Sequence, residues 1–259
     1  MRATRLILCP LLLIALSAPA ADAVGADVLA RTRAQVANFL KLFSEVRCFE
    51  EVSQIKLTKH GKVEHQEKSV YDYLVIAQES GSELSLQESR LEQQGAAKKT
   101  NVPMLVTNGF ATLLLVFHPS YQDSFDFSPP EMEVANGQTL AKIRFRHRPN
   151  KPSTTELVLR GREYPLDLTG TAWIDPDSGS IVRIEAELAQ SMDDIGLRVL
   201  RTDVEYAPVT LRGVDASLRL PSMATVEVET ARQHWRNVHR FRGYQHFDVS
   251  VEETVKAQK

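Results

Sequence analysis

Residues Gly170 to Leu188 read GTAWIDPDSGSIVRIEAEL, two strand-like segments joined by the cluster Asp-Pro-Asp-Ser-Gly. In the second segment, apolar residues alternate with charged ones, and the apolar positions are Val182, Ile184, Ala186 and Leu188. A period of two is typical of a strand with one buried face. Because Asp, Pro and Gly favour tight turns, the stretch predicts an antiparallel hairpin with one apolar and one charged side.

The same alternation recurs in four other segments. Their candidate inward positions are Ile143, Phe145 and His147; Leu200, Thr202, Val204 and Tyr206; Val226 and Val228; and Phe247, Val249 and Val251. Parallel sheets bury both faces, so strands with one charged face favour an antiparallel, meandering sheet. Further turns are expected in the segment RGVD from Arg212 and at a bend containing Gly243. Since twisted sheets of many strands curl, we predict an α+β fold with a strongly curved antiparallel sheet that forms an unclosed β-barrel.

Two helical segments and two further strands complete this prediction. Residues Val24 to Val46 place apolar side chains on one helical face, with Asp27 as a candidate N-cap. Residues Ala111 to Val116 form a short apolar helix that ends at Pro119. The strands are Val70 to Ile76 and Glu83 to Leu91, followed by the polar loop GAAKKTN. We expect both helices to pack on or in the concave face of the sheet, and an incomplete fit would leave a dry groove.

The N-terminus has the three parts of a secretory signal peptide. Arg2 and Arg5 precede the apolar run Leu6 to Leu16, and two Ala-x-Ala motifs follow before Val24. The apolar run is shorter than the roughly 20 residues that span a bilayer, which favours cleavage over anchoring. A lipoprotein signal at Cys9 fits poorly, because Leu8 stands where a small residue is required. We therefore predict a cleaved signal peptide over residues 1–23 and one soluble, periplasmic domain over residues 24–259.

Cysteine and charge content exclude several classes of site and partner. Cleavage removes Cys9 and leaves Cys48, so no intramolecular disulfide can form, and a small buried apolar role for Cys48 is favoured over a reactive thiol. The formal net charge of −2 argues against nucleic acid as a partner. No zinc-binding H-E-x-x-H, nucleotide-binding glycine loop or G-x-S-x-G occurs. We therefore predict a protein that is not an enzyme and that uses no cofactor or metal.

Several side chains nevertheless have the chemistry of ligands. His234, His239 and His246 lie close in sequence, but their spacing matches no known metal site. A turn is favoured over a calcium loop for the Asp-Pro-Asp-Ser-Gly cluster, whose glycine falls at the wrong position. A solvated turn is likewise favoured for the pair Asp193 and Asp194. His118 and His147 are interpreted as structural residues with satisfied hydrogen bonds.

Basic and aromatic residues are interleaved between residues 232 and 244. The set comprises Arg232, Trp235, Arg236, Arg240, Phe241, Arg242 and Tyr244. One interpretation is a rim that makes peripheral contact with a membrane or meets an acidic partner. The other is a solvated strand whose cations pair with acidic stripes on neighbouring strands, and this is favoured because cross-strand pairing already accounts for the charges. The acidic stripes are Asp203, Glu205, Glu227 and Glu229.

The order of these elements, with GTAWIDPDSGSIVRIEAEL, RLPSMATVEVE and RGYQHFDVSVEE, resembles the LolA/LolB superfamily of outer-membrane lipoprotein carriers. The segments FRHRPNKPS, LRGREYPLDLTGTAWIDP and HWRNVHRF are more similar to uncharacterised secreted bacterial relatives. The resemblance covers nearly all of residues 24–259 as a pattern and assigns no role to an individual residue. It implies an unclosed barrel of about eleven strands, with helices as a lid over an apolar cavity for lipid or lipoprotein acyl chains.

These observations predict an exported, non-catalytic protein that binds lipid or acyl chains by burying their apolar surface. The candidate lining residues on the concave face are Ile143, Phe145, Trp173, Val182, Ile184, Leu188, Val204 and Tyr206. The alternative is an envelope regulatory or assembly module that binds another protein through the sheet edge or rim, and a filled interior would favour it. An unrecognised hydrolase is a third hypothesis, which requires a serine, a histidine and a carboxylate within hydrogen-bond reach.

Overall fold

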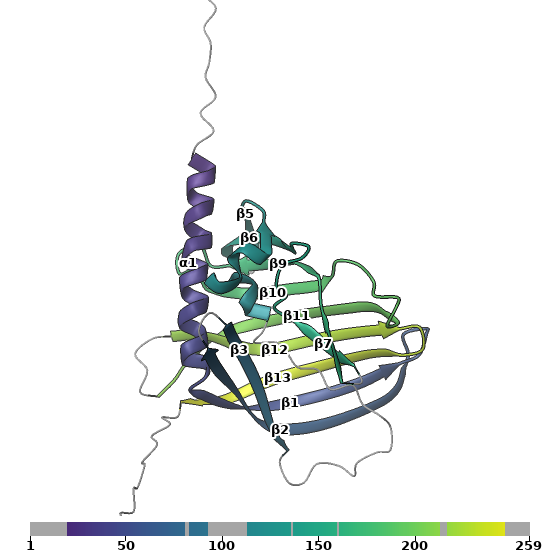
Figure 1. The fold of residues 1–259 in the computed structure, drawn as a ribbon. Helices are drawn as coiled ribbons and strands as arrows, with labels where there is room; N and C mark the ends of the chain where they lie inside the picture. The colour runs from purple at the N-terminus through teal and green to yellow at the C-terminus, as the bar shows by residue number, and fades with distance from the viewer. Residues whose placement is uncertain are drawn as a thin grey trace, which may run out of the picture.

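The computed structural model describes residues 20–80, 83–92, 113–135, 137–159, 161–212 and 217–246 (Figure 1). Within them lie one long helix, two short 3-10 helices and thirteen strands. The helices are α1 (Ala20–Phe43), η1 (Leu114–Phe117) and η2 (Pro119–Ser124). The strands are β1 (Val46–Leu57), β2 (Val63–Ser80), β3 (Glu83–Glu92), β4 (Phe125–Phe127), β5 (Glu131–Ala135), β6 (Gln138–His147), β7 (Glu156–Leu159), β8 (Arg162–Pro165), β9 (Leu168–Ile174), β10 (Ile181–Leu188), β11 (Leu197–Thr210), β12 (Ser217–Thr230) and β13 (His234–His246).

Eleven of these strands form one antiparallel sheet that is not closed. Ten follow the order β3-β2-β1-β13-β12-β11-β10-β9-β6-β4, and β5 pairs with β6 beside β4. The hairpin β7-β8 stands apart as a second, two-stranded sheet. The order departs from a simple meander because β13 lies between β1 and β12 and so joins the two ends of the described chain (Figure 1). The predicted class, a curved antiparallel sheet with few helices, is confirmed.

Alternation along the strands has the predicted effect on burial. In β6, Ile143, Phe145 and His147 are buried, while Arg144 and Arg146 between them are exposed. The charged side of the sheet carries cross-strand ion pairs such as Arg183 with Asp203 and Arg236 with Glu227. Of the basic residues between 232 and 244, Arg236 makes the predicted contact with an acidic stripe. Burial therefore divides the sheet into a concave apolar face and an outer charged face.

The hairpin predicted for residues 170–188 is present and consists of β9, β10 and the turn between them. The Oδ1 atom of Asp175 accepts hydrogen bonds from the amides of Asp177 and Ser178 at 3.0 and 3.2 Å. Gly179 follows with a φ of 73°, a left-handed conformation that glycine adopts without steric penalty. The turn is thus held by its own aspartate and ended by its own glycine.

The N-terminal helix differs from its prediction at both ends. It runs from Ala20 to Phe43, so Asp27 lies inside it and forms an ion pair with Arg31 one turn later instead of an N-cap. Val46, predicted to end the helix, begins β1. The helix ends earlier because residues 44 and 45 form a tight turn. Val46 then pairs with His246 of β13 as the first residue of β1.

The short apolar helix is confirmed over the described part of its range. All four residues of η1 are buried, and the helix ends before Pro119, which opens η2. His118 lies between them, and its Nδ1 atom accepts a hydrogen bond from the amide of Ser120 at 3.2 Å. Together η1 and α1 contribute to the same apolar core as the concave face, α1 through Val28, Val36, Phe39, Leu40 and Phe43.

The expected bend at Gly243 is instead a bulge inside β13. Gly243 has a φ of 66°, and the pairing with β1 shifts register between Arg47 and Phe49. A Cβ atom on Gly243 would lie 3.0 Å from the ring of Phe49. Glycine therefore allows the ring of Phe49 to pack close to the backbone, and the chain continues in the same strand. The sequence thus correctly predicted an irregular backbone at Gly243, but the irregularity is a bulge within one strand and not a bend between two strands.

Some predictions fall outside the described residues. These are most of the signal peptide (residues 1–19), the loop GAAKKTN, part of the turn after Glu79, residues 111 and 112 of the short helix, most of the RGVD turn and the strand from Phe247. Among the helices that the structure does describe, none has the length and apolar character needed to cross a membrane.

Candidate ligand site beneath the N-terminal helix

Most of the predicted lining residues do converge on the concave face. Ile143, Phe145, Ile184, Val204 and Tyr206 come from strands β6, β10 and β11 and are each at most 4% exposed. Leu188, at the end of β10, is half-buried and packs against the same core. Whether these residues bind a lipid stays a prediction, but their placement in one apolar interior is established.

Trp173 lies on the opposite, outer face. Its neighbours Ala172 and Ile174 are fully buried, so the alternation of β9 directs Trp173 outward. There its ring lies beneath the cations of Lys142 and Arg183, at 5.7 and 5.0 Å from the ring centroid. The prediction that Trp173 lines the interior was wrong because it followed residue type instead of parity, and the outer face gains a cation–π cluster.

Val182 is displaced from the interior by a β-bulge. The register of β10 against β9 shifts between Ile181 and Arg183, which pair with Ile174 and Trp173. Ile181 consequently takes the buried position at 5% exposure, and Val182 is half-buried. Strict alternation, on which the prediction of Val182 rested, fails at this one residue.

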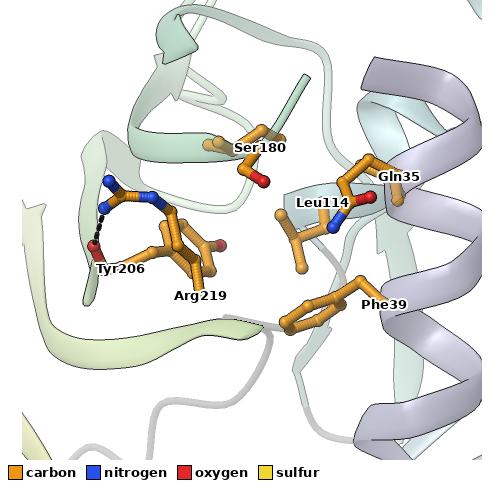
Figure 2. Close-up of a pocket in the computed structure, with 8 residues that line it drawn as sticks. Gln35, Phe39, Leu114, Ser180, Tyr206 and Arg219 are labelled. Carbon is orange, nitrogen blue, oxygen red and sulfur yellow. Dashed lines mark hydrogen bonds between the residues drawn. The ribbon is translucent and has the colours of Figure 1, made fainter. Parts of the chain in front are cut away.

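A small pocket lies where α1 meets the concave face. Its volume is about 20 Å³, so it holds about one water molecule and no acyl chain. Figure 2 shows the side chains that enclose it. The lining residues are Gln35, Val36 and Phe39 of α1, Leu114 of η1, Ser180 and Ile181 beside the hairpin turn, Tyr206 of β11 and Arg219 of β12. Where α1 and η1 pack on the concave face, the described side chains therefore leave space for little more than one water molecule.

Among the described residues, the hydroxyl group of Tyr206 has no hydrogen-bond partner, although Tyr206 is only 4% exposed. Burial raises the pKa of this phenol above its ordinary value, so the hydroxyl stays protonated at neutral pH. Nearby, the guanidinium of Arg219 donates to the backbone carbonyl of Tyr206 at 3.4 Å (Figure 2). An unpaired buried hydroxyl is destabilising by about 1–3 kcal/mol. At this pocket a polar group of the interior is therefore left without the hydrogen bond that would offset its burial.

The Asp-Pro-Asp-Ser-Gly turn has a second role, because it is where α1 docks onto the sheet. The guanidinium of Arg31 donates to the carbonyl oxygen of Asp177 at 3.2 Å. A Cβ atom on Gly179 would lie 2.7 Å from the backbone of Arg31, closer than such atoms approach. Only glycine allows the helix to lie this near, so the turn fixes the position of α1 over the pocket.

A buried charged cluster occupies another part of the concave face. Glu50 of β1, Arg90 of β3 and His239 of β13 meet there, with Glu50 and His239 almost fully buried. Nδ1 of His239 lies 2.7 Å from a Glu50 oxygen and, with a carboxylate opposite, is the donor. The guanidinium of Arg90 also lies over the ring of Tyr73, 5.0 Å from its centroid. Every member has a partner within the cluster, which is typical of a structural network.

The three histidines near the C-terminal end of the described chain do not gather at one site. His234, His239 and His246 each contact a different glutamate, namely Glu227, Glu50 and Glu45. Within the described residues no three potential metal ligands gather. Burial raises the pKa of the Cys48 thiol to about 12, so this buried cysteine is neutral, as its predicted apolar role requires.

Three polar residues of the pocket were not predicted. Gln35 is a polar residue of a helix that was predicted from its apolar face, and Ser180 directly follows the Asp-Pro-Asp-Ser-Gly turn. Arg219 stands between Leu218 and Leu220, a pattern that indicates an outward position. No local signal marks these three, because they meet only when α1 is laid against the turn and the start of β12.

Comparison with known proteins yields a distant likeness. No protein-family model matches the chain, and no curated protein matches it. Among solved structures, the crystal structure of a DUF1329 family protein from Desulfovibrio piger ATCC 29098 is similar, with 13% sequence identity and a TM-score of 0.44. The match covers 89% of this chain and 94% of that one.

Proposed function

We propose that this protein binds an amphiphile with one acyl chain, whose tail replaces α1 on the concave face and whose anionic end occupies the pocket beneath it. The observation that carries the proposal is the hydroxyl of Tyr206, which is buried between α1 and the sheet and has no partner in the described part of the chain. A carboxylate or phosphate placed there would accept a hydrogen bond from the Tyr206 hydroxyl. The guanidinium of Arg219, which donates to the backbone carbonyl of the same residue, would have to turn toward the anion to contribute its charge. The adjoining apolar surface suits the tail.

Displacement of α1 is required, because a pocket of about 20 Å³ admits no chain. The five buried apolar side chains of α1 contribute about 1.5–3 kcal/mol each, or roughly 8–15 kcal/mol in all. An acyl chain regains about 0.8 kcal/mol per buried methylene, so roughly 10–19 methylenes offset the loss of the helix. Ordinary membrane acyl chains fall in this range. The exchange is therefore close to balanced, as reversible loading and release require.

The attachment of α1 suits a movable cover. Its described polar contacts with the sheet region are the hydrogen bond from Arg31 to the hairpin turn and the Arg33 guanidinium, 5.8 Å from the ring centroid of Phe127. Both involve half-buried arginines at the surface, where such contacts add little stability. Release of the helix would thus depend mainly on what replaces its apolar stripe.

The signal-like N-terminus and the resemblance to lipoprotein carriers support export to the periplasm and binding without catalysis. In this proposal the protein carries or presents its ligand and makes or breaks no covalent bond. Contact with a membrane would be peripheral, at the moment of loading. The ligand classes are lipids and the acyl chains of lipoproteins.

The test is native mass spectrometry with lipid extraction on protein purified from a membrane-bearing host, followed by titration with palmitate and with hexadecanol. We expect co-purified acyl species, and faster hydrogen exchange in α1 once palmitate is bound. Arg219→Gln should weaken palmitate binding about tenfold and leave hexadecanol binding within twofold, since only palmitate carries the charge that Arg219 meets.

The matched control is Arg240→Gln, which removes an exposed arginine from the outer side of β13. It should alter neither affinity. Protein that emerges free of lipid, binds neither probe and keeps α1 protected would eliminate the proposal.

One observation favours the second candidate, a protein-binding module. Among the described strands, β5 pairs only with β6, and Met132 and Val134 on it are 55% and 73% exposed. An uncovered apolar edge strand is a template for pairing with another chain. The filled interior also fits this alternative better than a permanently open carrier. Loss of a partner on Val134→Lys, with unchanged palmitate binding, would assign the edge this role.

A further inference from the structure

A larger depression lies at the opposite end of the strands from α1. The turn between β12 and β13 stands at the right of Figure 1, whereas α1 stands at the left. This turn, the loop before β11 and the hairpin strand β8 line a groove of about 840 Å³, within the range of small-molecule sites. Its principal lining residues are Arg162, Tyr164, Asp194, Gly196, Arg232 and Gln233.

The two arginines of this groove differ from those of the outer face. Arg144, Arg183 and Arg201 each contact a carboxylate across the strands. Arg162 and Arg232 are exposed and form no ion pair with any residue that the structure describes. Arg162 and Arg232 are about seventy positions apart in sequence, so they do not belong to one local run of charges. The fold brings these two guanidinium groups, neither of which is in an ion pair with a described residue, to one concave surface.

We propose that this groove binds a phosphate group of a polar ligand through Arg162 and Arg232. A carboxylate is saturated by one two-pronged guanidinium, whereas a phosphate offers three acceptor oxygens and up to two negative charges, which suit two arginines. The turn residues add polar groups, among them the side chain of Gln233. The site is distinct from the pocket beneath α1, with which it shares no lining residue.

Tyr164 and Asp194 narrow the class of ligand. Tyr164 is half-buried and gives the groove an aromatic surface, and the exposed carboxylate of Asp194 leaves the lining with a net charge of one positive unit. A ligand with several negative charges would meet the carboxylate of Asp194 unfavourably. A phosphate ester of a neutral polyol, either free or as a lipid headgroup, matches the lining best.

The experiment measures two probes against the full chain: soluble glycerol 3-phosphate by titration calorimetry, and phosphatidylglycerol vesicles by flotation, with uncharged galactolipid vesicles as a reference. We expect binding to at least one phosphate probe and none to galactolipid. Arg162→Gln with Arg232→Gln should lower the affinity at least tenfold. Binding to glycerol 3-phosphate identifies a free ester as the source, and binding to the vesicles alone identifies a headgroup.

The control is the double variant Arg201→Gln with Arg236→Gln, which removes the same charge from exposed, already paired positions of the outer face. Its affinity should stay within twofold of the original protein, and circular dichroism verifies that both double variants are folded. Equal loss in the two double variants would reduce the effect to net charge and overturn the proposal. So would the absence of binding to either phosphate probe.

Discussion

The carboxylate of Glu50 and the guanidinium of Arg90 form a two-pronged ion pair, at 2.5 and 3.0 Å, inside the curved sheet. The two residues belong to β1 and β3, and β2 lies between these strands. The ion pair therefore crosses β2, where the Arg90 guanidinium lies over the ring of Tyr73. His239 adds a hydrogen bond to Glu50 from β13. Four neighbouring strands are thus fastened by one buried cluster near the open edge of the sheet.

Removal of one partner from this pair should be severe. Glu50→Ala leaves the Arg90 guanidinium largely buried without its main counter-charge, and we expect a loss of about 3–5 kcal/mol in the free energy of unfolding. The double variant Glu50→Met with Arg90→Met should lose much less, because both charges disappear together. Urea denaturation measures both. Equal losses in the single and double variants would contradict the pairing.

The same cluster predicts that the protein becomes less stable in acid. Burial raises the pKa of Glu50, but hydrogen bonds from His239 and Arg90 outweigh burial and hold it below its ordinary value. Burial lowers the pKa of His239 more than Glu50 raises it. Both groups therefore bind protons less readily when folded, and the unfolded chain takes up more protons as the pH falls.

The pH range of this loss of stability follows from the lowered pKa values of His239 and Glu50 in the folded protein. Stability is fully present above about pH 6.5, declines first as unfolded-state protonation of His239 sets in, and declines further below about pH 4.5 through Glu50. Urea midpoints measured from pH 8 to pH 4 check this. His239→Gln should remove the decline between pH 6.5 and pH 5, and an unchanged slope in that variant would show that His239 is not the group responsible.

Cys48 should resist thiol reagents in the folded protein. The side chain is 4% exposed, and burial raises its pKa to about 12, so almost no thiolate is present at pH 8. Iodoacetamide followed by peptide mapping should show Cys48 unmodified in buffer and fully modified in urea. Rapid labelling without denaturant would instead indicate frequent opening of β1.

Two adjacent positions on β10 test which face is buried. Ile184 is fully buried, so Ile184→Glu places an unpaired charge in the apolar core and should prevent folding or lower stability by several kcal/mol. Glu185→Ala removes one carboxylate near Arg183, which keeps Asp203, and should change stability by less than about 0.5 kcal/mol. The milder Ile184→Val should lose about 1 kcal/mol. Comparable effects at both positions would refute the face assignment.

The hairpin turn should control the docking of α1. Gly179→Ala adds a Cβ atom 2.7 Å from the backbone of Arg31 and should loosen the helix, so that its amides exchange about tenfold faster than those of β11 and β12. Gly61→Ala is the matched control, because Gly61 has a similar φ of 74° but no atom within 4 Å of the added carbon. Hydrogen exchange that is equally fast in both variants would mean that backbone strain, and not contact with α1, is responsible.

Local sequence patterns were sufficient to predict many of the strands and most of their buried faces. Alternation between charged and apolar residues is a local property of a strand, and it placed Ile143, Phe145, Ile184 and Val204 inward without knowledge of the partners. The Asp-Pro-Asp-Ser-Gly turn is equally local, since Asp175 satisfies the amides of its own turn. The same is true of the break before Pro119, where the missing amide prevents a continuous helix.

Other features depend on contacts between segments that are distant in sequence. The bulge at Val182, the outward position of Trp173 and the insertion of β13 between β1 and β12 depend on which strand lies opposite. Glu50 and His239, 189 positions apart, share a hydrogen bond that no pattern in either segment indicates. How fully α1 and η1 fill the concave face depends on summed side-chain volumes and on how closely the helix approaches Gly179. Periodicity specifies direction, whereas packing depends on shape, which becomes defined only when distant segments meet.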